Sequence, residues 1–248
     1  RSAPRPWWIL ASRSGWSGSW NVTVAELILA LDLPGPDARR LLDRLPQARW
    51  VKVGSILYVR EGPALIRELV ARGLKVFLDL KWHDIPNTVG EAVGAARELQ
   101  VSMATVHTLG GEAMMAAAAR AAGPDLGIVG VSVLTSHSAE SYATAVGRST
   151  VDVLDEVRRL SSAAVRSGLR GVVCSPLEVE PVRAHVALGG WIVVPGIRRS
   201  GDRAGDQVRT ATPAEAARAG ATHLVVGRPI LQAADPTAVF RAMSEDAG

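Results

Sequence analysis

Charged side chains gather in one short stretch of this sequence, at the end of an apolar segment. The stretch Val76-Phe77-Leu78-Asp79-Leu80-Lys81 reads as a strand, and Asp84 follows it closely. Side chains of a strand alternate between its two faces, so Asp79 and Lys81 share one face. Lys52 ends another apolar segment, and we expect it to point the same way. Carboxylates raise the pKa of a nearby lysine, so the set predicts ammonium groups held among carboxylates.

Lysine is rare in this chain, and two of the few lysines belong to this set. Only three of the 28 basic residues are lysines. Lysine can release a proton near neutral pH and arginine cannot, so the set suits proton transfer. The alternative is an ordinary surface ion-pair cluster, which leaves the polar residues at the other strand ends unexplained.

Two glycine–arginine pairs follow later apolar segments and predict a phosphate site. They are Pro195-Gly196-Ile197-Arg198 and Val226-Gly227-Arg228-Pro229. Glycine lets backbone N–H groups approach an anion, and arginine offers a planar fork to phosphate. Gln207, between the two pairs, is a candidate for an additional amide donor. One such pair alone would indicate only a turn.

Short apolar segments alternate along the chain with segments of helical periodicity. Eight apolar segments read as strands: 25–32, 50–55, 75–81, 102–108, 126–135, 171–176, 191–198 and 223–229. Helical patterns lie between them, such as 61–72, 88–100, 111–122, 151–167 and 213–219. Apolar strands that alternate with amphipathic helices are typical of a parallel sheet with both faces covered.

Eight such units in about 225 residues fit the size of a (β/α)8 barrel. The alternative is a doubly wound sheet, which normally carries a glycine-rich phosphate turn after its first strand. The segment Leu31-Asp32-Leu33-Pro34 at that place has no such turn. We therefore expect an α/β protein with one TIM barrel domain over 25–248. Its chemistry should lie at the carboxyl ends of the strands, where the sequence places Asp32, Lys52, Asp79, Lys81, His107, Thr135, Pro176, Arg198 and Arg228.

The composition excludes several classes of protein. The chain has 248 residues, 48% of them hydrophobic, and a net charge of +4. Residues 1–24 carry three arginines and no acidic residue, and we predict a disordered N-terminal extension there. The remainder shows no basic stripe for nucleic acid, and its apolar runs are shorter than the roughly 18 residues of a membrane span. A single cysteine fits a reducing compartment and a cytoplasmic protein, and the histidines lack metal-ligand spacing.

The stretch 79–89, with the pattern D-x-K-x-x-D-I-P-N-T-V, resembles the signature of orotidine 5′-phosphate decarboxylase, in its short bacterial type. Enzymes of that family catalyse the last step of de novo UMP synthesis. The pattern is highly specific, whereas the glycine–arginine pairs alone are not. The resemblance extends over residues 25–245 and includes the segments 31–32, 51–54, 106–107, 134–136, 195–198, 205–207 and 227–228.

The resemblance implies catalytic roles at matching positions. Lys81 matches the lysine that protonates C6 of the pyrimidine as CO2 leaves. Asp79 and Asp84 match the aspartates of an alternating charged network, and Lys52 matches its other lysine.

The resemblance also implies how orotidine 5′-phosphate, a small-molecule substrate, is bound. Asp32 and Lys52 match residues that hold the ribose hydroxyls, and Thr135 matches one near the pyrimidine. The matches at phosphate or phosphate-loop positions are Arg198, Gln207, Gly227 and Arg228.

A homodimer is implied as well, because in that family the second aspartate reaches the active site of the partner subunit. Asp84 matches that aspartate, and Ile85 and Thr88 match its neighbours. No metal and no other cofactor is implied.

Two other functions remain open at this stage. One is a magnesium-dependent sugar-phosphate decarboxylase or aldolase on a similar barrel, such as a hexulose-phosphate synthase. In those enzymes we expect an acidic metal ligand on the second strand, where this chain has Lys52. The other is a non-catalytic protein that binds a phosphate ligand, which would have little use for two lysines among aspartates.

Overall fold

The computed structural model of the chain describes residues 24–187, 189–201 and 209–248. The predicted N-terminal extension and Gln207 lie outside the described residues, apart from Val24.

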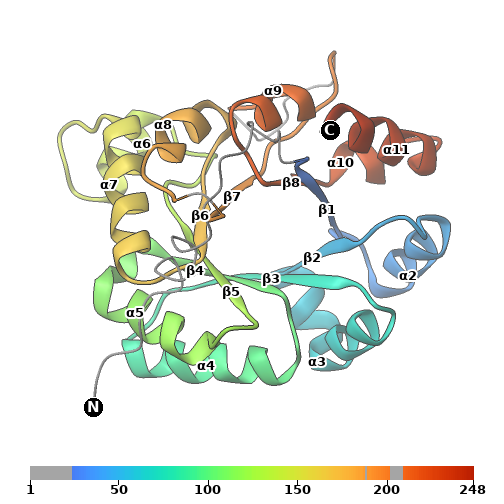
Figure 1. The fold of residues 1–248 in the computed structure, drawn as a ribbon, viewed down its shortest axis with the longest axis horizontal. Helices are drawn as coiled ribbons and strands as arrows, with labels where there is room; N and C mark the ends of the chain where they lie inside the picture. Colours follow the sequence, from blue (N-terminus) through green and yellow to red (C-terminus); the bar gives the residue numbers. More distant parts are fainter. Residues whose placement is uncertain (1–23, 188, 202–208) are drawn as a thin grey trace, which may run out of the picture.

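Eight parallel strands close into a barrel in chain order, which confirms the predicted architecture (Figure 1). The strands are β1 (Glu26–Ala30), β2 (Trp50–Gly54), β3 (Lys75–Trp82), β4 (Met103–His107), β5 (Gly127–Val131), β6 (Gly171–Val173), β7 (Trp191–Val194) and β8 (His223–Val226). Helices surround them in Figure 1: α2 (Gly35–Arg44), α3 (Ser55–Ala71), α4 (Pro86–Glu98), α5 (Gly111–Ala122), α6 (Ala139–Ala145), α7 (Val153–Arg166), α8 (Val179–Arg183), α9 (Pro213–Arg218), α10 (Arg228–Leu231) and α11 (Pro236–Asp246). Two short 3₁₀ turns are η1 (Thr108–Gly110) and η2 (Pro176–Glu178).

Several strands end earlier than their apolar runs predict. The run 126–135 ends as a strand at Val131, and the run 171–176 ends at Val173. Beyond these points the chain leaves the ladder, and Pro176, which lacks an N–H group, begins η2 instead. Thr135 and Arg198 therefore lie in the loops after β5 and β7, whereas the charged residues Lys52, Asp79 and Lys81 lie within their strands.

Helix α3 is also longer than predicted. It begins at Ser55 instead of residue 61, because two helical pieces join across a kink at Gly62, where φ is 64°. Helix α2 fills the place between the first two strands, where no helical segment was named from the sequence.

Strand alternation separates two apolar layers. Leu27 and Leu29 of β1 pack outward against the helices, while Ile28 and Ala30 pack inside the barrel. Phe77 of β3 joins the same inner cluster. Asp32 lies two residues after Ala30, and Asp79 lies two residues after Phe77. Because side chains alternate along a strand, both carboxylates point inward at the mouth of the barrel.

The amino-terminal end of the barrel is closed by three aromatic rings. Trp50, Trp191 and His223 pack edge to face, with ring centroids 5.1–6.1 Å apart. Gly127 makes room for this packing, because a Cβ there would overlap the Trp191 ring. The opposite end is thereby left as the open one.

Among the described residues, no helix has the length and apolar character that crossing a membrane requires.

The buried ring of His223 predicts a loss of stability in acid. Burial, with a smaller contribution from the charge of Lys75, lowers the pKa of His223 to about 4. The unfolded chain takes up this proton near pH 6.5, so stability should fall by up to about 3 kcal/mol as the pH drops from about 6.5 to about 4. In His223→Phe, which keeps a ring between the tryptophans, urea unfolding at several pH values should show a smaller fall. An equal fall in both proteins would contradict this assignment.

Candidate active site

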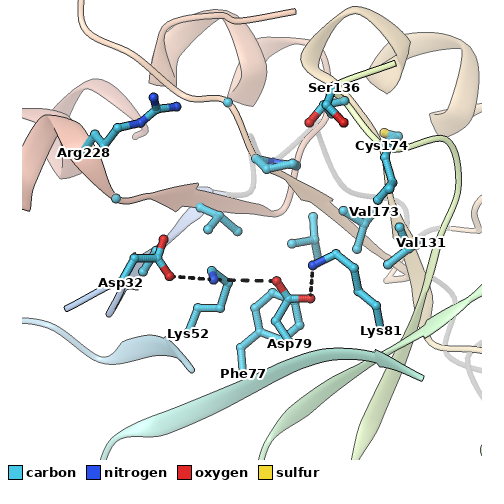
Figure 2. Close-up of a pocket in the computed structure, with 18 of the residues that line it drawn as sticks. Asp32, Lys52, Phe77, Asp79, Lys81, Val131, Ser136, Val173, Cys174 and Arg228 are labelled. Atoms are coloured by element: carbon cyan, nitrogen blue, oxygen red, sulfur yellow. Dashed lines mark hydrogen bonds and ion pairs between the residues drawn. The ribbon is translucent and has the colours of Figure 1, made fainter. Parts of the chain in front are cut away.

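A cavity of about 360 Å³ opens at the carboxyl ends of the strands (Figure 2). Strands β1–β3 and β5–β8 and the loops after them supply its walls. Its floor is apolar, because Ala30, Phe77, Val193 and Val225 are inward core residues. The polar residues that line its upper part are Asp32, Lys52, Asp79, Lys81, Thr135, Ser136, Arg198 and Arg228.

Four charged side chains form a continuous row across this cavity, drawn with dashed lines in Figure 2. Lys52 Nζ lies 3.3 Å from Asp32 Oδ1 and 3.7 Å from Asp79 Oδ2. Lys81 Nζ donates to Asp79 Oδ1 at 2.8 Å. Asp79 therefore bridges the two ammonium groups. The predicted convergence of Lys52, Asp79 and Lys81 is what the structure shows.

The Asp79 carboxylate is held ionised by its neighbours. The Asp79 side chain is only 12% exposed. Burial raises its pKa, but the charges of Lys81 and Lys52, with hydrogen bonds from Lys81 and Thr105, outweigh burial and lower the pKa below its ordinary value. The stabilisation that accompanies this shift is present above the ordinary pKa of about 3.9 and is lost as the pH falls through the lowered one.

Thr105, which sequence reasoning missed, fixes the geometry around Lys81. Its Oγ1 donates to Asp79 Oδ1 at 3.0 Å and accepts the Lys81 backbone N–H at 2.8 Å. Lys81 has a φ of 51°, an uncommon conformation for a residue with a side chain. The pairing of β3 with β4 shifts register between Leu78 and Trp82. Strand alternation could have pointed to Thr105, because Thr105 lies two residues before His107 and therefore shares its face of the fourth strand.

Asp84 does not join the charged row of its own chain. Asp84, Ile85 and Thr88 are all exposed and do not line the cavity. The Asp84 carboxylate accepts the Ile85 backbone N–H at 2.6 Å. Within one chain, the second aspartate of the row is thus Asp32 instead of Asp84. The positive φ of Lys81 is the physical reason, because it interrupts the alternation just before β3 ends at Trp82.

The two glycine–arginine pairs line the same cavity on the side of β7 and β8. Arg198 is only 8% exposed and donates from Nη1 to the Ile197 carbonyl at 2.8 Å. Gly196 has a φ of 81°, which favours glycine at this turn. Gly227 precedes α10, which begins at Arg228. Of the residues predicted to bind phosphate, those that the structure describes therefore line the same cavity as the charged row.

Neither Cys174 nor the histidines beside the mouth offer a nucleophile or a metal centre. Cys174 lines the cavity, but burial raises the pKa of its thiol to about 12. The His83 and His107 rings stack with centroids 5.5 Å apart. Burial, together with the nearby His83 and Lys81, lowers the pKa of His107 to about 4. Among the described residues, no three His, Cys, Asp or Glu side chains gather as metal ligands.

The hydroxyl group of Thr105 should contribute to stability because Thr105 is fully buried and the Asp79 side chain is only 12% exposed. Thr105→Val removes the hydrogen bonds to Asp79 and Lys81 and should lower the free energy of unfolding by about 1–3 kcal/mol. Thr105→Ser keeps the hydroxyl and should lose less. Denaturant unfolding of the three proteins measures the difference, and a valine variant as stable as the serine variant would contradict the role given to the hydroxyl.

Comparison with known proteins identifies the family of the chain. The sequence profile described as "Orotidine 5'-phosphate decarboxylase / HUMPS family" matches residues 25–243. A relative from Opitutus terrae named orotidine 5'-phosphate decarboxylase is 49% identical over 87% of this chain and 95% of its own length. One of the same name from Anaeromyxobacter sp. is 47% identical over 88% and 96%. The crystal structure of orotidine 5'-phosphate decarboxylase from Lactobacillus acidophilus superposes with a TM-score of 0.80 at 34% identity, covering 90% of this chain and 99% of that one. The chain therefore belongs to the orotidine 5'-phosphate decarboxylase / HUMPS family.

Proposed function

We propose that the protein converts orotidine 5′-phosphate to UMP and CO2 in pyrimidine biosynthesis. The observation that carries this proposal is the Lys52–Asp79–Lys81 row, which shares one cavity with the arginines of the two glycine–arginine pairs. Relatives of 40–49% identity carry the name of this enzyme. The protein acts in the cytoplasm and needs no metal or other cofactor.

The substrate lies across the cavity with its phosphate towards β7 and β8. Arg198, Arg228 and the backbone at Gly227 bind the phosphate, and Gln207 adds an amide donor. Asp32 and Lys52 bind the ribose hydroxyls, which suits their position beside each other, Asp32 just after β1 and Lys52 on β2. Thr135 borders the pyrimidine. This orientation brings C6 of the ring towards Lys81.

Lys81 is the acid of the reaction. When the bond between C6 and the carboxylate breaks, CO2 departs and the electron pair remains on C6. An ammonium group held at that carbon stabilises the developing charge and then transfers its proton to C6, which gives UMP. Asp79 holds the ammonium in place through the 2.8 Å contact, and Lys52 keeps Asp79 ionised from the other side.

A homodimer completes the site. Asp84, Ile85 and Thr88 belong to the stretch that resembles the family signature, yet they are exposed and do not line the cavity of their own chain. Ile85 is 66% exposed, which is unusual for a large apolar side chain. We therefore place Asp84 and its two neighbours at the active site of the partner subunit.

Removal of Lys81 should abolish turnover. In Lys81→Ala, decarboxylation of orotidine 5′-phosphate, followed by ultraviolet absorbance in the presence of EDTA, should fall by about 10³-fold or more. Lys75→Ala is the matched control, because Lys75 begins the same strand and lies over the Trp50 ring at the closed end. Its activity should equal that of the wild type.

Three results would contradict parts of this proposal. Activity that survives in Lys81→Ala would mean that the reaction is right and the proton donor wrong. Turnover that EDTA abolishes, or folded wild-type protein that turns over only sugar phosphates with magnesium, would favour the magnesium-dependent alternative. Binding of UMP with no turnover of any kind would favour a phosphate-ligand binder.

The shared site predicts that two inactive variants restore each other. Lys81→Ala and Asp84→Asn, mixed in equal amounts under conditions of subunit exchange, should recover about one quarter of wild-type activity, because half the dimers contain one intact site. Lys81→Ala mixed with Arg198→Ala is the matched control and should recover none, since both residues serve the site of their own chain. Equal recovery in the two mixtures, or a monomeric protein, would contradict the shared site.

A further inference from the structure

A buried ion pair lies beside the cavity without lining it. Arg209 Nη1 donates to Glu178 Oε1, and the two side chains are only 13% and 4% exposed. The second prong of the Arg209 guanidinium, Nη2, donates to the Leu134 carbonyl at 3.3 Å. The other oxygen of Glu178, Oε2, accepts the Ser175 backbone N–H at 2.8 Å. Each charged group is thus bonded to the other and to one backbone group, the Leu134 carbonyl for Arg209 and the Ser175 N–H for Glu178.

These contacts join the loops that follow three neighbouring strands. Leu134 belongs to the loop after β5, where the next two residues line the cavity. Ser175 and Glu178 belong to the loop after β6, directly beyond Cys174, which lines the cavity as well. Arg209 belongs to the segment after β7.

The same segment is tied to the phosphate side of the site. Two residues after Arg209, the Ala211 carbonyl accepts the backbone N–H of Arg198 at 2.9 Å. Ile197 and Ala211 also form a parallel bridge. The ion pair therefore connects the backbone that carries Arg198 with the backbone that carries Thr135, on the two sides of the cavity.

Stability alone gives little reason to bury such a pair. Removal of two charges from water costs free energy that their attraction only partly restores, and apolar residues of similar volume often stabilise a protein as well or better. Arg209 Nε, moreover, is buried without a hydrogen-bond partner. The pair does fix the orientation of the groups it joins, because a planar guanidinium holds both of its acceptors in one plane.

We propose that Arg209 and Glu178 are positioning residues of the active site. They hold the loops after β5, β6 and β7 in the arrangement that lets Arg198 and Thr135 contact one substrate molecule. This inference rests on the proposed decarboxylase, since the substrate must span both sides of the cavity.

The test separates positioning from stability with three variants. Arg209→Lys keeps the charge but loses the fork. The double variant Arg209→Met/Glu178→Leu replaces the pair by apolar groups. Glu156→Gln is the matched control. Like Glu178, Glu156 is almost fully buried, at 5% exposed, and it pairs with Arg159 and Arg148. It lies on α7 and does not line the cavity. For each protein we would measure the Tm, kcat, KM and inhibition by UMP.

In Arg209→Lys and in the double variant, kcat/KM should fall by about 10- to 100-fold, chiefly through KM, with a similar loss in UMP affinity. The Tm of the double variant should lie closer to that of the wild type than the Tm of Arg209→Lys does, but its activity should be no higher. Glu156→Gln should lower the Tm and leave kcat/KM and UMP affinity within about two-fold of the wild type.

Two outcomes would overturn the proposal. One is a folded Arg209→Lys or double variant with wild-type kcat/KM and UMP affinity. The other is a loss in Glu156→Gln as large as that in Arg209→Lys, which would reduce the effect to general destabilisation. Wild-type protein that binds UMP but does not decarboxylate orotidine 5′-phosphate would instead overturn the proposed function, and UMP affinity across the same variants would still decide the role of the pair.

Discussion

The Asp79 carboxylate, buried between two ammonium groups, is the interaction on which the rest of the site depends. An ionised carboxylate at 12% exposure persists only with close positive partners, and Lys81 and Lys52 provide them at 2.8 and 3.7 Å. Thr105 adds a hydrogen bond and ties the same carboxylate to the backbone of Lys81. The arrangement holds the Lys81 side chain against Asp79 at the wall of the cavity.

The barrel provides what this arrangement requires. Parallel strands bring distant segments of the chain to one rim, and alternation along β1, β2 and β3 turns Asp32, Lys52 and Asp79 inward together. The aromatic cluster of Trp50, Trp191 and His223 closes the other end. The chemistry is thereby confined to a rim whose loops are linked to each other by side chains as well as by backbone.

The barrel, the charged row and the place of Arg198 and Arg228 at the cavity could be predicted because they follow from period-two alternation and from residue types at strand ends. Other features depend on departures from that period. The positive φ of Lys81 and the register shift beside it were not visible in the apolar pattern, so the role of Thr105 as a partner of Asp79 and Lys81 was missed. The Arg209–Glu178 pair joins loops far apart in sequence, and neither residue belongs to a periodic segment.

The central claim is that Lys81 exchanges a proton with C6 of the pyrimidine. By microscopic reversibility, a group that delivers this proton must also remove it from UMP. We would therefore follow exchange of the C6 hydrogen of UMP in D2O by proton NMR, with wild-type protein and with Lys81→Arg, whose guanidinium keeps the charge but does not release a proton. Exchange in the wild type and none in the variant is the expected result. Equal exchange in both proteins would contradict the account.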